Sequence, residues 1–151
     1  MAYLQKKYSE ATELMELILF LYEESFSYDF KILEGNDCCL DPDYNPYAKT
    51  LFTTVLQFID LLGKKGCYRS ALEYNKFLIK LNPLLDPTGG LLLIDTTAIA
   101  AGESEFLQEF PMNFCQELYG SEAKFSVMFL PNFLYSIALT KFLDNFEEED
   151  G

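Results

Sequence analysis

Histidine and tryptophan are absent from the sequence, and cationic side chains are scarce. Without an imidazole, the chain has no histidine for general acid–base catalysis, for a catalytic triad or for a catalytic zinc site. Eleven Lys and Arg stand against 24 Asp and Glu, and the resulting net charge of −13 disfavours nonspecific binding to nucleic acid and anionic membranes. We therefore expect a protein that is not an enzyme, that needs no cofactor, and that binds neither a membrane nor a nucleic-acid sequence directly.

The four cysteines form no recognisable disulfide or metal-binding pattern. Cys38 and Cys39 are adjacent, and adjacent cysteines rarely bridge because the local geometry is strained. Cys67 and Cys115 complete the set, without a Cys-x-x-Cys pair, and Cys67 is expected to pack as a small hydrophobe. The opening MAYLQKKYSE has no signal region, and the run LMELILFLYEE is too short and too interrupted to span a bilayer. The sequence thus predicts an intracellular, reducing compartment and no bound metal.

Two further features of the sequence are possible sites. Gly89 and Gly90 are a lone pair that matches neither a phosphate-binding loop nor a dinucleotide fingerprint. Asp95 lies in the middle of an apolar segment, LLLIDTTAIAA, and is the carboxylate most open to a functional interpretation. The alternative is a structural, hydrogen-bonded aspartate, which is the commoner case.

What the chain has in abundance is apolar side chains at helical spacing. Half of its 151 residues are hydrophobic, with 14 Phe and 10 Tyr, which is typical of one domain with a sizeable core. The first helix is predicted to be capped by Ser9, with Glu10 and Glu13 in its first turn. Its apolar residues lie almost all round, which predicts burial on more than one side. The main stripe is Leu14, Leu17, Ile18 and Leu21, and it is widened by Met15, Leu19, Phe20 and Tyr22.

Two helices joined by a short turn are predicted next. The first begins near Pro46, after Asn45, and the second runs from about Cys67 to Leu81 and stops at Pro83. Gly63 and Gly66 are expected to bracket the turn, which forces antiparallel packing. The predicted core residues are Leu51, Val55, Phe58, Ile59 and Leu62 in the first helix, and Ala71, Leu72, Phe77 and Leu78 in the second.

Helical patterns continue to the end of the chain. Asp86 and Pro87 resemble an N-cap and a first helical residue, and Gly102 a C-terminal glycine. Pro111 is expected to kink or break the next helix, and Pro131 lies near the start of the last one. Six or seven helical segments result, with no strand-like alternation of any length. A strand at KFSVMFL would lack a partner, so a loop or helix extension is favoured there.

The spacing of the central pair partly matches a 34-residue tetratricopeptide repeat. With Pro83 as its terminal proline, Gly66, Tyr68 and Ala71 match, whereas Val55 stands at the usual Trp position and Asn75 at an aromatic one. A second good copy is not found. We therefore predict an all-α fold of antiparallel helical hairpins, as a tetratricopeptide-like α-solenoid. It forms a single domain over residues 1–146, followed by an acidic tail at 147–151.

A local basic spot lies at the predicted turn. Lys64, Lys65 and Arg69, the only arginine, are the candidate contacts for an acidic partner on this acidic chain. The alternative interpretation is that Arg69 only pairs with a carboxylate of its own fold, for instance Glu73 one turn on.

Three motifs, in order, resemble the helical region of the transcription factor 25 family. A Gly-Cys-x-Arg-Thr-Ala-Leu-Glu segment is matched by 66–73, with Ser70 in place of Thr. Leu-Leu-Leu-Ile-Asp is matched by 91–95 and Leu-Pro-Asn-Phe by 130–133, and the likeness spans about residues 10 to 145. The sequence departs at Thr96, where the family has histidine, and in lacking the charged N-terminal arm.

The resemblance implies a non-catalytic adaptor of ribosome-associated quality control. Family members work with the listerin-type ubiquitin ligase on stalled nascent chains at the large ribosomal subunit, helping ubiquitin-chain formation and recruitment of the extraction ATPase. The implied location is cytoplasmic and ribosome-associated. Animal members are also described as transcriptional repressors, so a nuclear co-regulator acting through protein contacts is the alternative.

Overall fold

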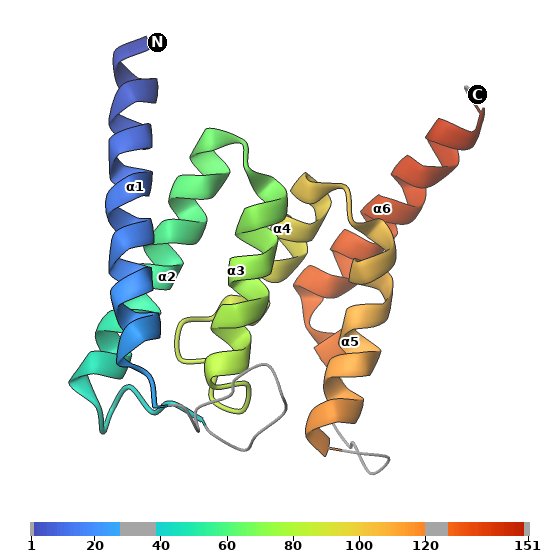
Figure 1. Ribbon diagram of the computed structural model, residues 1–151. Helices are drawn as coiled ribbons and strands as arrows, with labels where there is room; N and C mark the ends of the chain where they lie inside the picture. The colour runs from blue at the N-terminus through green and yellow to red at the C-terminus, as the bar shows by residue number, and fades with distance from the viewer. Residues whose placement is uncertain (1, 28–38, 120–126, 150–151) are drawn as a thin grey trace. The chain divides into compact units, whose positions relative to one another are not determined.

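The computed structural model describes residues 2–27, 39–119 and 127–149, and all their regular structure is helical (Figure 1). The all-α prediction is therefore confirmed for these residues. Two 3₁₀ turns, η2 (Gly90–Leu92) and η4 (Val127–Phe129), accompany six α-helices; η4 covers part of KFSVMFL, whereas Lys124 to Ser126 lie outside the described residues. The helices are α1 (Ala2–Ser25), α2 (Pro46–Lys65), α3 (Tyr68–Leu81), α4 (Ile94–Ala101), α5 (Ser104–Tyr119) and α6 (Pro131–Glu149).

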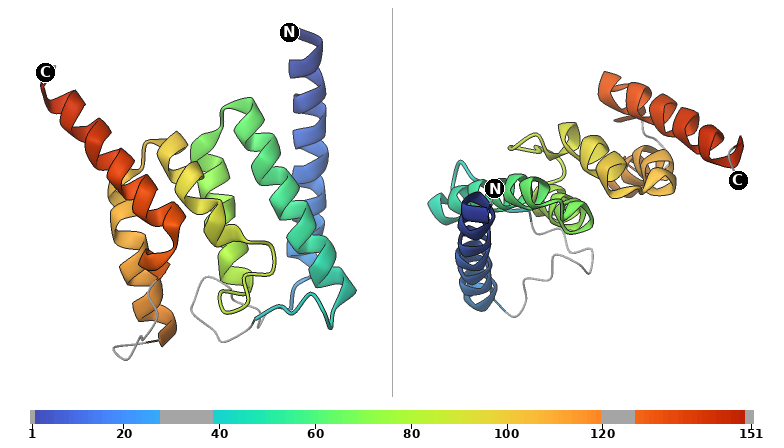
Figure 2. Two further views of the ribbon diagram at one scale, coloured as in Figure 1. Left: turned by 180° about the vertical axis from the view of Figure 1, so that it is seen from behind. Right: turned by 90° about the horizontal axis from the view of Figure 1, so that it is seen from above.

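The chain groups into two compact units, Met1–Leu91 and Leu92–Gly151, which are described separately. In the first, α1 packs on α2 and α2 packs on α3; Figure 2 shows α1 beside α2 from two further directions. In the second, α4, α5 and α6 pack on one another, with η4 against α5 and α6. The single domain, the acidic tail and the tetratricopeptide-like solenoid stay predictions.

The start predicted for the first helix is wrong. The helix α1 begins at Ala2, so Ser9 is an exposed mid-helix residue rather than its cap, and Glu10 and Glu13 lie outside the first turn. A cap sequence is a weak local preference, whereas Tyr8 lies before it and packs against the core of the unit. Tertiary contact therefore extends the helix past its sequence signal.

The burial predicted for α1 on more than one side is correct for one side only: Met15, Leu19 and Tyr22 pack, whereas the main stripe does not. Its packing stripe lies about a third of a turn away from the predicted one, and it holds the helix against the core. The packing residues are Tyr8, Ala11, Met15, Leu19, Tyr22 and Phe26. The predicted stripe is exposed instead, with exposed fractions of 62% at Leu14, 54% at Leu17, 40% at Ile18 and 59% at Leu21.

The hairpin of α2 and α3 follows the sequence closely. Asn45 caps α2 by accepting hydrogen bonds from the backbone N–H groups of Tyr47 (2.9 Å) and Ala48 (3.4 Å), with Pro46 at the first position. The five predicted core residues of α2 are all buried, as are Ala71, Leu72 and Leu78 of α3, and Phe77 is partly buried against them. Phe58 and Tyr74 meet edge to face with ring centroids 4.7 Å apart.

Asn82 closes the far end of this hairpin. Its side-chain amide donates to the carbonyl oxygen of Leu40 (2.9 Å) and its carbonyl accepts from the N–H of Leu85 (3.1 Å). The N–H of Leu40 also donates to the carbonyl of Leu81 (2.9 Å). Asn82 is 2% exposed, so these bonds satisfy a buried amide and fix the segment before α2 to the end of α3.

Asp86 caps a helical turn, but not the helix that the sequence predicted it to cap. Its carboxylate accepts from the N–H groups of Gly90 (2.7 Å) and Leu91 (2.9 Å), and thereby caps η2. The helix α4 begins later, at Ile94, without a side-chain cap, so Pro87 is not its first residue. Gly90 must be glycine here, because a Cβ would lie 2.8 Å from Cγ1 of Ile79.

In the second unit, the helix end predicted at Gly102 is confirmed, with φ 72° in the left-handed region. A kink or a break was predicted at Pro111; the break is wrong, because α5 continues through this residue, and the kink stays a prediction. Pro111 is fully buried, and its packing offsets the missing backbone donor. Beside it, the Phe110 ring lies 5.3 Å from those of Phe106 and Phe114 and 5.9 Å from that of Phe133.

Candidate partner-binding surface

The basic candidates flank a glycine turn between α2 and α3. The N–H of Gly66 donates to the carbonyl of Gly63 (3.0 Å), and the N–H of Cys67 donates to that of Leu62 (2.9 Å). With φ 79° at Gly66, this is a Schellman motif that ends α2. Gly63 belongs to the last helical turn rather than bracketing the loop, so the prediction of two bracketing glycines is half correct.

Cys67 does not pack as the sequence predicted. Its thiol is exposed, and the residue serves through its backbone, since its carbonyl accepts from the N–H of Ala71 (3.0 Å) at the start of α3. A residue directly after a left-handed glycine lies at the tip of the hairpin, beyond the reach of the core. Ala71, one turn later, is 1% exposed and structural as predicted.

Lys64 is held by its own helix. Its Nζ donates to Oδ2 of Asp60 at 2.5 Å, four residues earlier, with 52% of the Lys64 side chain and 65% of the Asp60 side chain exposed. This hydrogen bond, together with the carboxylate charge, raises the pKa of Lys64 above its usual value. Solvent-exposed pairs of this kind are weak, so Lys64 can exchange Asp60 for a partner's carboxylate.

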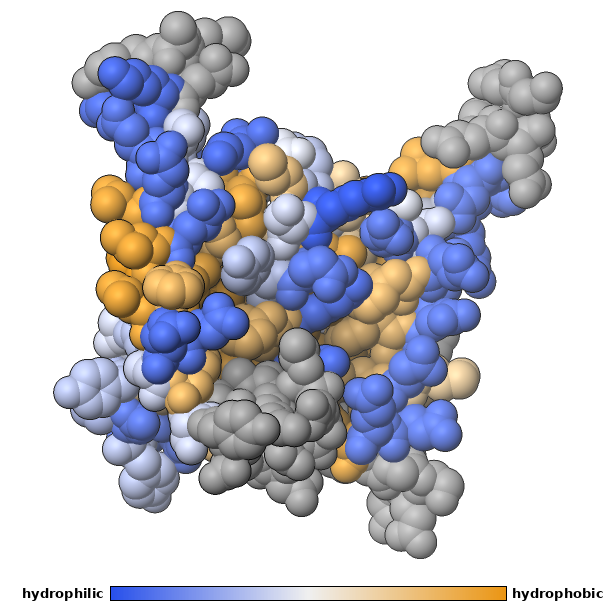
Figure 3. All heavy atoms as spheres, in the orientation of Figure 1, coloured by the Kyte–Doolittle hydropathy of each residue, from blue (hydrophilic) through white to orange (hydrophobic). Residues whose placement is uncertain are grey.

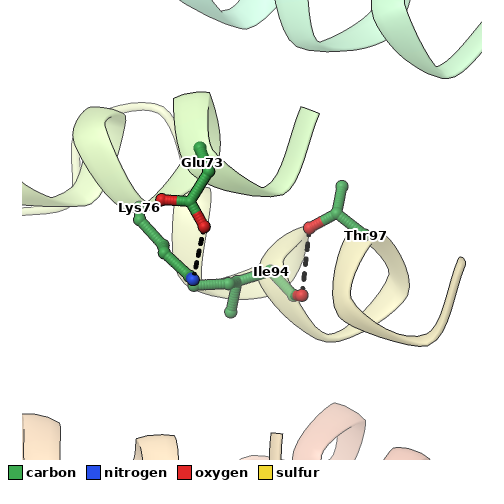
Figure 4. A network of polar contacts seen from close by, with 4 residues as sticks. All are labelled: Glu73, Lys76, Ile94 and Thr97. Carbon is green, nitrogen blue, oxygen red and sulfur yellow. Dashed lines mark hydrogen bonds and ion pairs between the residues drawn. The ribbon is translucent and has the colours of Figure 1, made fainter. Parts of the chain in front are cut away.

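Lys65 and Arg69 are exposed on either side of the turn, in the last turn of α2 and the first of α3. The turn thus brings the three predicted residues to one end of the hairpin (Figure 1). The alternative pairing of Arg69 with Glu73 has a competitor, because Nζ of Lys76 donates to Oε1 of Glu73 at 2.7 Å (Figure 4). Pairing of Arg69 with Glu73 stays a prediction.

Asp95 has the structural role that the sequence favoured. Its Oδ2 accepts from the hydroxyl of Ser136 (2.7 Å), which joins α4 to α6, and both residues are buried. Its Oδ1 has no hydrogen-bond partner in the described part of the chain. On α4 nearby, the hydroxyl of Thr97 donates to the carbonyl of Ile94 at 3.0 Å (Figure 4).

The described residues bear on three further predictions, which concern metal binding, the cysteines and membrane-spanning helices. No three of their His, Cys, Asp and Glu side chains come together as a metal site would require. Cys39 is exposed and Cys115 is buried, whereas Cys38 lies outside the described residues. In the same residues, no helix has the length and apolar character to cross a membrane.

An exposed apolar surface was missed in the sequence. We call Leu14, Leu17, Ile18 and Leu21 the outer stripe of α1; hydrophobic side chains gather over α1 on the face drawn in Figure 3. The sequence predicts this stripe to be core, because apolar residues at i, i+3, i+4 and i+7 indicate burial but do not show what the helix packs against. The signal that could have found it is that α1 carries two such stripes.

These features define an acidic, all-helical protein whose distinctive surfaces are a basic turn and an apolar helix face. The family model described as "Transcriptional repressor TCF25" matches residues 1–150, and the chain belongs to this family. The resemblance stated from three motifs is thereby confirmed.

Its relatives carry two kinds of name. "Ribosome quality control complex subunit TCF25" of Mus musculus is 35% identical over 139 residues, which are 92% of this chain and 19% of the relative. The protein of the same name from Dictyostelium discoideum is 30% identical over 89% of the chain and 18% of its own length. "Probable transcription factor claV" of Ampulloclitocybe clavipes is 29% identical over 97% of the chain and 19% of its own length. No solved structure matches significantly.

The chain therefore spans about a fifth of the length of these relatives. Their names describe a subunit of a complex and a transcription factor, and neither is the name of an enzyme.

Proposed function

We propose that the chain is a non-catalytic adaptor of ribosome-associated quality control, which supports ubiquitination and clearance of stalled nascent chains on the large ribosomal subunit. The observation that carries this is the identity of 35% over 92% of the chain to a relative named as a subunit of that complex. The chain matches only 19% of that relative. The assignment of the whole relative's activity to this chain is therefore proposed.

The partners are the listerin-type ubiquitin ligase, ubiquitin, the large ribosomal subunit and the extraction ATPase, in the cytoplasm. In the proposed tetratricopeptide-like arrangement, stacked helical hairpins provide extended surfaces for protein binding. The basic turn of Lys64, Lys65 and Arg69 is the contact for an acidic protein surface or for ribosomal phosphate, because cations are few on a chain of charge −13.

The test reverses two of these charges in the full chain. Lys64→Glu with Arg69→Glu should weaken association with purified large ribosomal subunits or with listerin roughly tenfold, which is about 1.4 kcal/mol. The melting temperature should change little, because both side chains are exposed.

The matched control is Lys49→Glu with Lys80→Glu. These exposed lysines lie on the same two helices at the opposite end of the hairpin and give the same change in net charge. Binding should survive in the control. Equal loss in both variants would mean that only net charge matters, and retained binding in the first would remove the turn from the proposed surface.

A nuclear transcriptional co-regulator is the second candidate. It is favoured by the description of the family model as a transcriptional repressor and by the relative named as a probable transcription factor. Affinity purification of the intact protein separates the two, since large ribosomal subunits should co-purify under the first proposal and chromatin factors under the second.

A further inference from the structure

The helix α1 has two apolar stripes, and only one of them packs within the first unit. The inner stripe, from Tyr8 to Phe26, packs against the core. The outer stripe leaves 40 to 62% of each side chain exposed. Its span of seven residues is about 10 Å along the helix, or two turns.

This pattern is typical of a helix with neighbours on two sides. Leu14, Leu17, Ile18 and Leu21 follow the i, i+3, i+4, i+7 spacing by which one amphipathic helix binds another. Phe20, beside the stripe, is 53% exposed and enlarges the surface. Large contiguous apolar patches on the surface of a protein mark sites of association.

Acidic side chains run along one edge of the outer stripe. Glu10, Glu13 and Glu24 are exposed and fall into one helical row with Leu17 and Phe20. Glu10 also pairs with Lys6 of the same helix at 3.9 Å, and this contact is weak because the two side chains are 61% and 77% exposed.

The net charge and the acidic edge indicate which kind of partner binds the outer stripe. A second copy would add another net charge of −13 and a second acidic edge, so repulsion disfavours it. An anionic membrane is disfavoured for the same reason. A helix with a matching apolar stripe and lysine or arginine along one edge complements both features.

We propose that the outer stripe of α1 binds an amphipathic helix of a partner protein, with the basic edge of that helix against Glu10, Glu13 and Glu24. This surface is separate from the basic turn, where the charges have the opposite sign. The inference goes beyond the proposed ribosomal function and does not depend on it.

The test uses a synthetic helical peptide with a leucine stripe, lysines along one edge and a single tryptophan. Because the chain has no tryptophan, the peptide's fluorescence reports binding without competing tryptophan emission from the protein. The full chain should bind it saturably with a Kd below about 100 μM, and a matched peptide with glutamate along the edge should bind at least tenfold more weakly. No saturation, or equal binding of the two peptides, would overturn the proposal.

Two variants locate the surface. Leu17→Gln with Leu21→Gln should weaken binding of the lysine peptide about tenfold or more. The matched control, Leu134→Gln with Leu139→Gln on α6, changes leucines of 49% and 46% exposure in the other unit and should bind like the unchanged chain. Equal loss in both variants would show unspecific apolar adsorption and contradict the proposal.

A charge variant keeps the test valid if the leucine substitutions disturb folding. Glu13→Lys with Glu24→Lys leaves the apolar residues intact and should reverse the preference between the two peptides. An unchanged preference would overturn the acidic-edge argument. Sedimentation equilibrium addresses the second-copy alternative, since a dimer of the unchanged chain that Leu17→Gln with Leu21→Gln makes monomeric would assign the stripe to self-association and overturn the proposal.

Discussion

Three polar side chains fix the backbone where the helices of the first unit begin and end. Asn45, Asn82 and Asp86 each accept backbone N–H bonds, and Asn82 also donates to Leu40, 42 residues away. Such bonds satisfy groups that would otherwise lose water on folding without replacement. The second unit has a comparable link in the hydrogen bond between Asp95 and Ser136.

We expect Ser136→Ala to reduce the free energy of unfolding by about 1–3 kcal/mol, because it leaves the buried Asp95 carboxylate without its donor. Urea denaturation of the full chain provides the measurement. Ser25→Ala is the control: its hydroxyl also donates, to the carbonyl of Tyr22 (2.7 Å), but is exposed, so the change should stay within about 0.5 kcal/mol. Equal effects at both serines would contradict the structural role of the Asp95 link.

Tyr74 links stability to pH. Burial, followed by the nearby carboxylates of Glu16 and Glu23, raises its pKa above the usual 10.0. The neutral phenol is therefore favoured in the folded protein, and its contribution to stability is present below pH 10.0 and is lost as pH rises through the higher folded-state pKa. Tyr74→Phe should flatten the fall in melting temperature above pH 10; the same slope in both proteins would contradict the shift.

At the scale of elements, the sequence predicted helices well where one residue decides their boundary. Pro46 and Pro131 mark the starts of α2 and α6, because a missing N–H is harmless only in the first turn. The sequence-based predictions were wrong where tertiary packing determines the extent of a helix. Ser9 was predicted to cap α1, but Tyr8, which precedes it, packs against the core and the helix includes both. A break of α5 was predicted at Pro111 as the alternative to a kink, but this residue is buried within that helix.

The two glycines at the end of α2 should respond to alanine with opposite signs. Nothing lies within 4 Å of an added Cβ at either position, so only the backbone matters. Gly66→Ala places alanine at φ 79° and should cost about 1–2 kcal/mol, whereas Gly63→Ala lies within the helix and should stabilise by about 0.5–1 kcal/mol. Thermal unfolding of both variants measures this, and the same sign in both would contradict the Schellman assignment.

The candidate surfaces also divide into one that local sequence determines and one that tertiary packing determines. The basic turn was predictable, because Gly66 and the charges around it are local in sequence. The outer stripe of α1 was not, since two stripes of similar hydrophobicity lie on one helix and nothing in the sequence says which of them meets α2. The partner of Asp95 lies 41 residues away, beyond any local pattern.

At the scale of the whole molecule, the expectation concerns helical content, because the chain of net charge −13 has apolar residues at helical spacing throughout. Circular dichroism of the full chain should be predominantly helical, because all regular structure in the described residues is helical. Strand content above about a fifth, the usual share in globular proteins, would contradict the all-α fold.

The hairpin of α2 and α3 is closed at both ends, by the Schellman turn at Gly66 and by Asn82 at Leu40. Much of its core comes from residues close in sequence, which keeps the entropic cost of its assembly low. It therefore suits the role of a folding nucleus onto which α1 adds later. Loosening either closure should slow refolding in stopped-flow experiments, whereas substitutions on the outer stripe of α1 should leave the refolding rate unchanged.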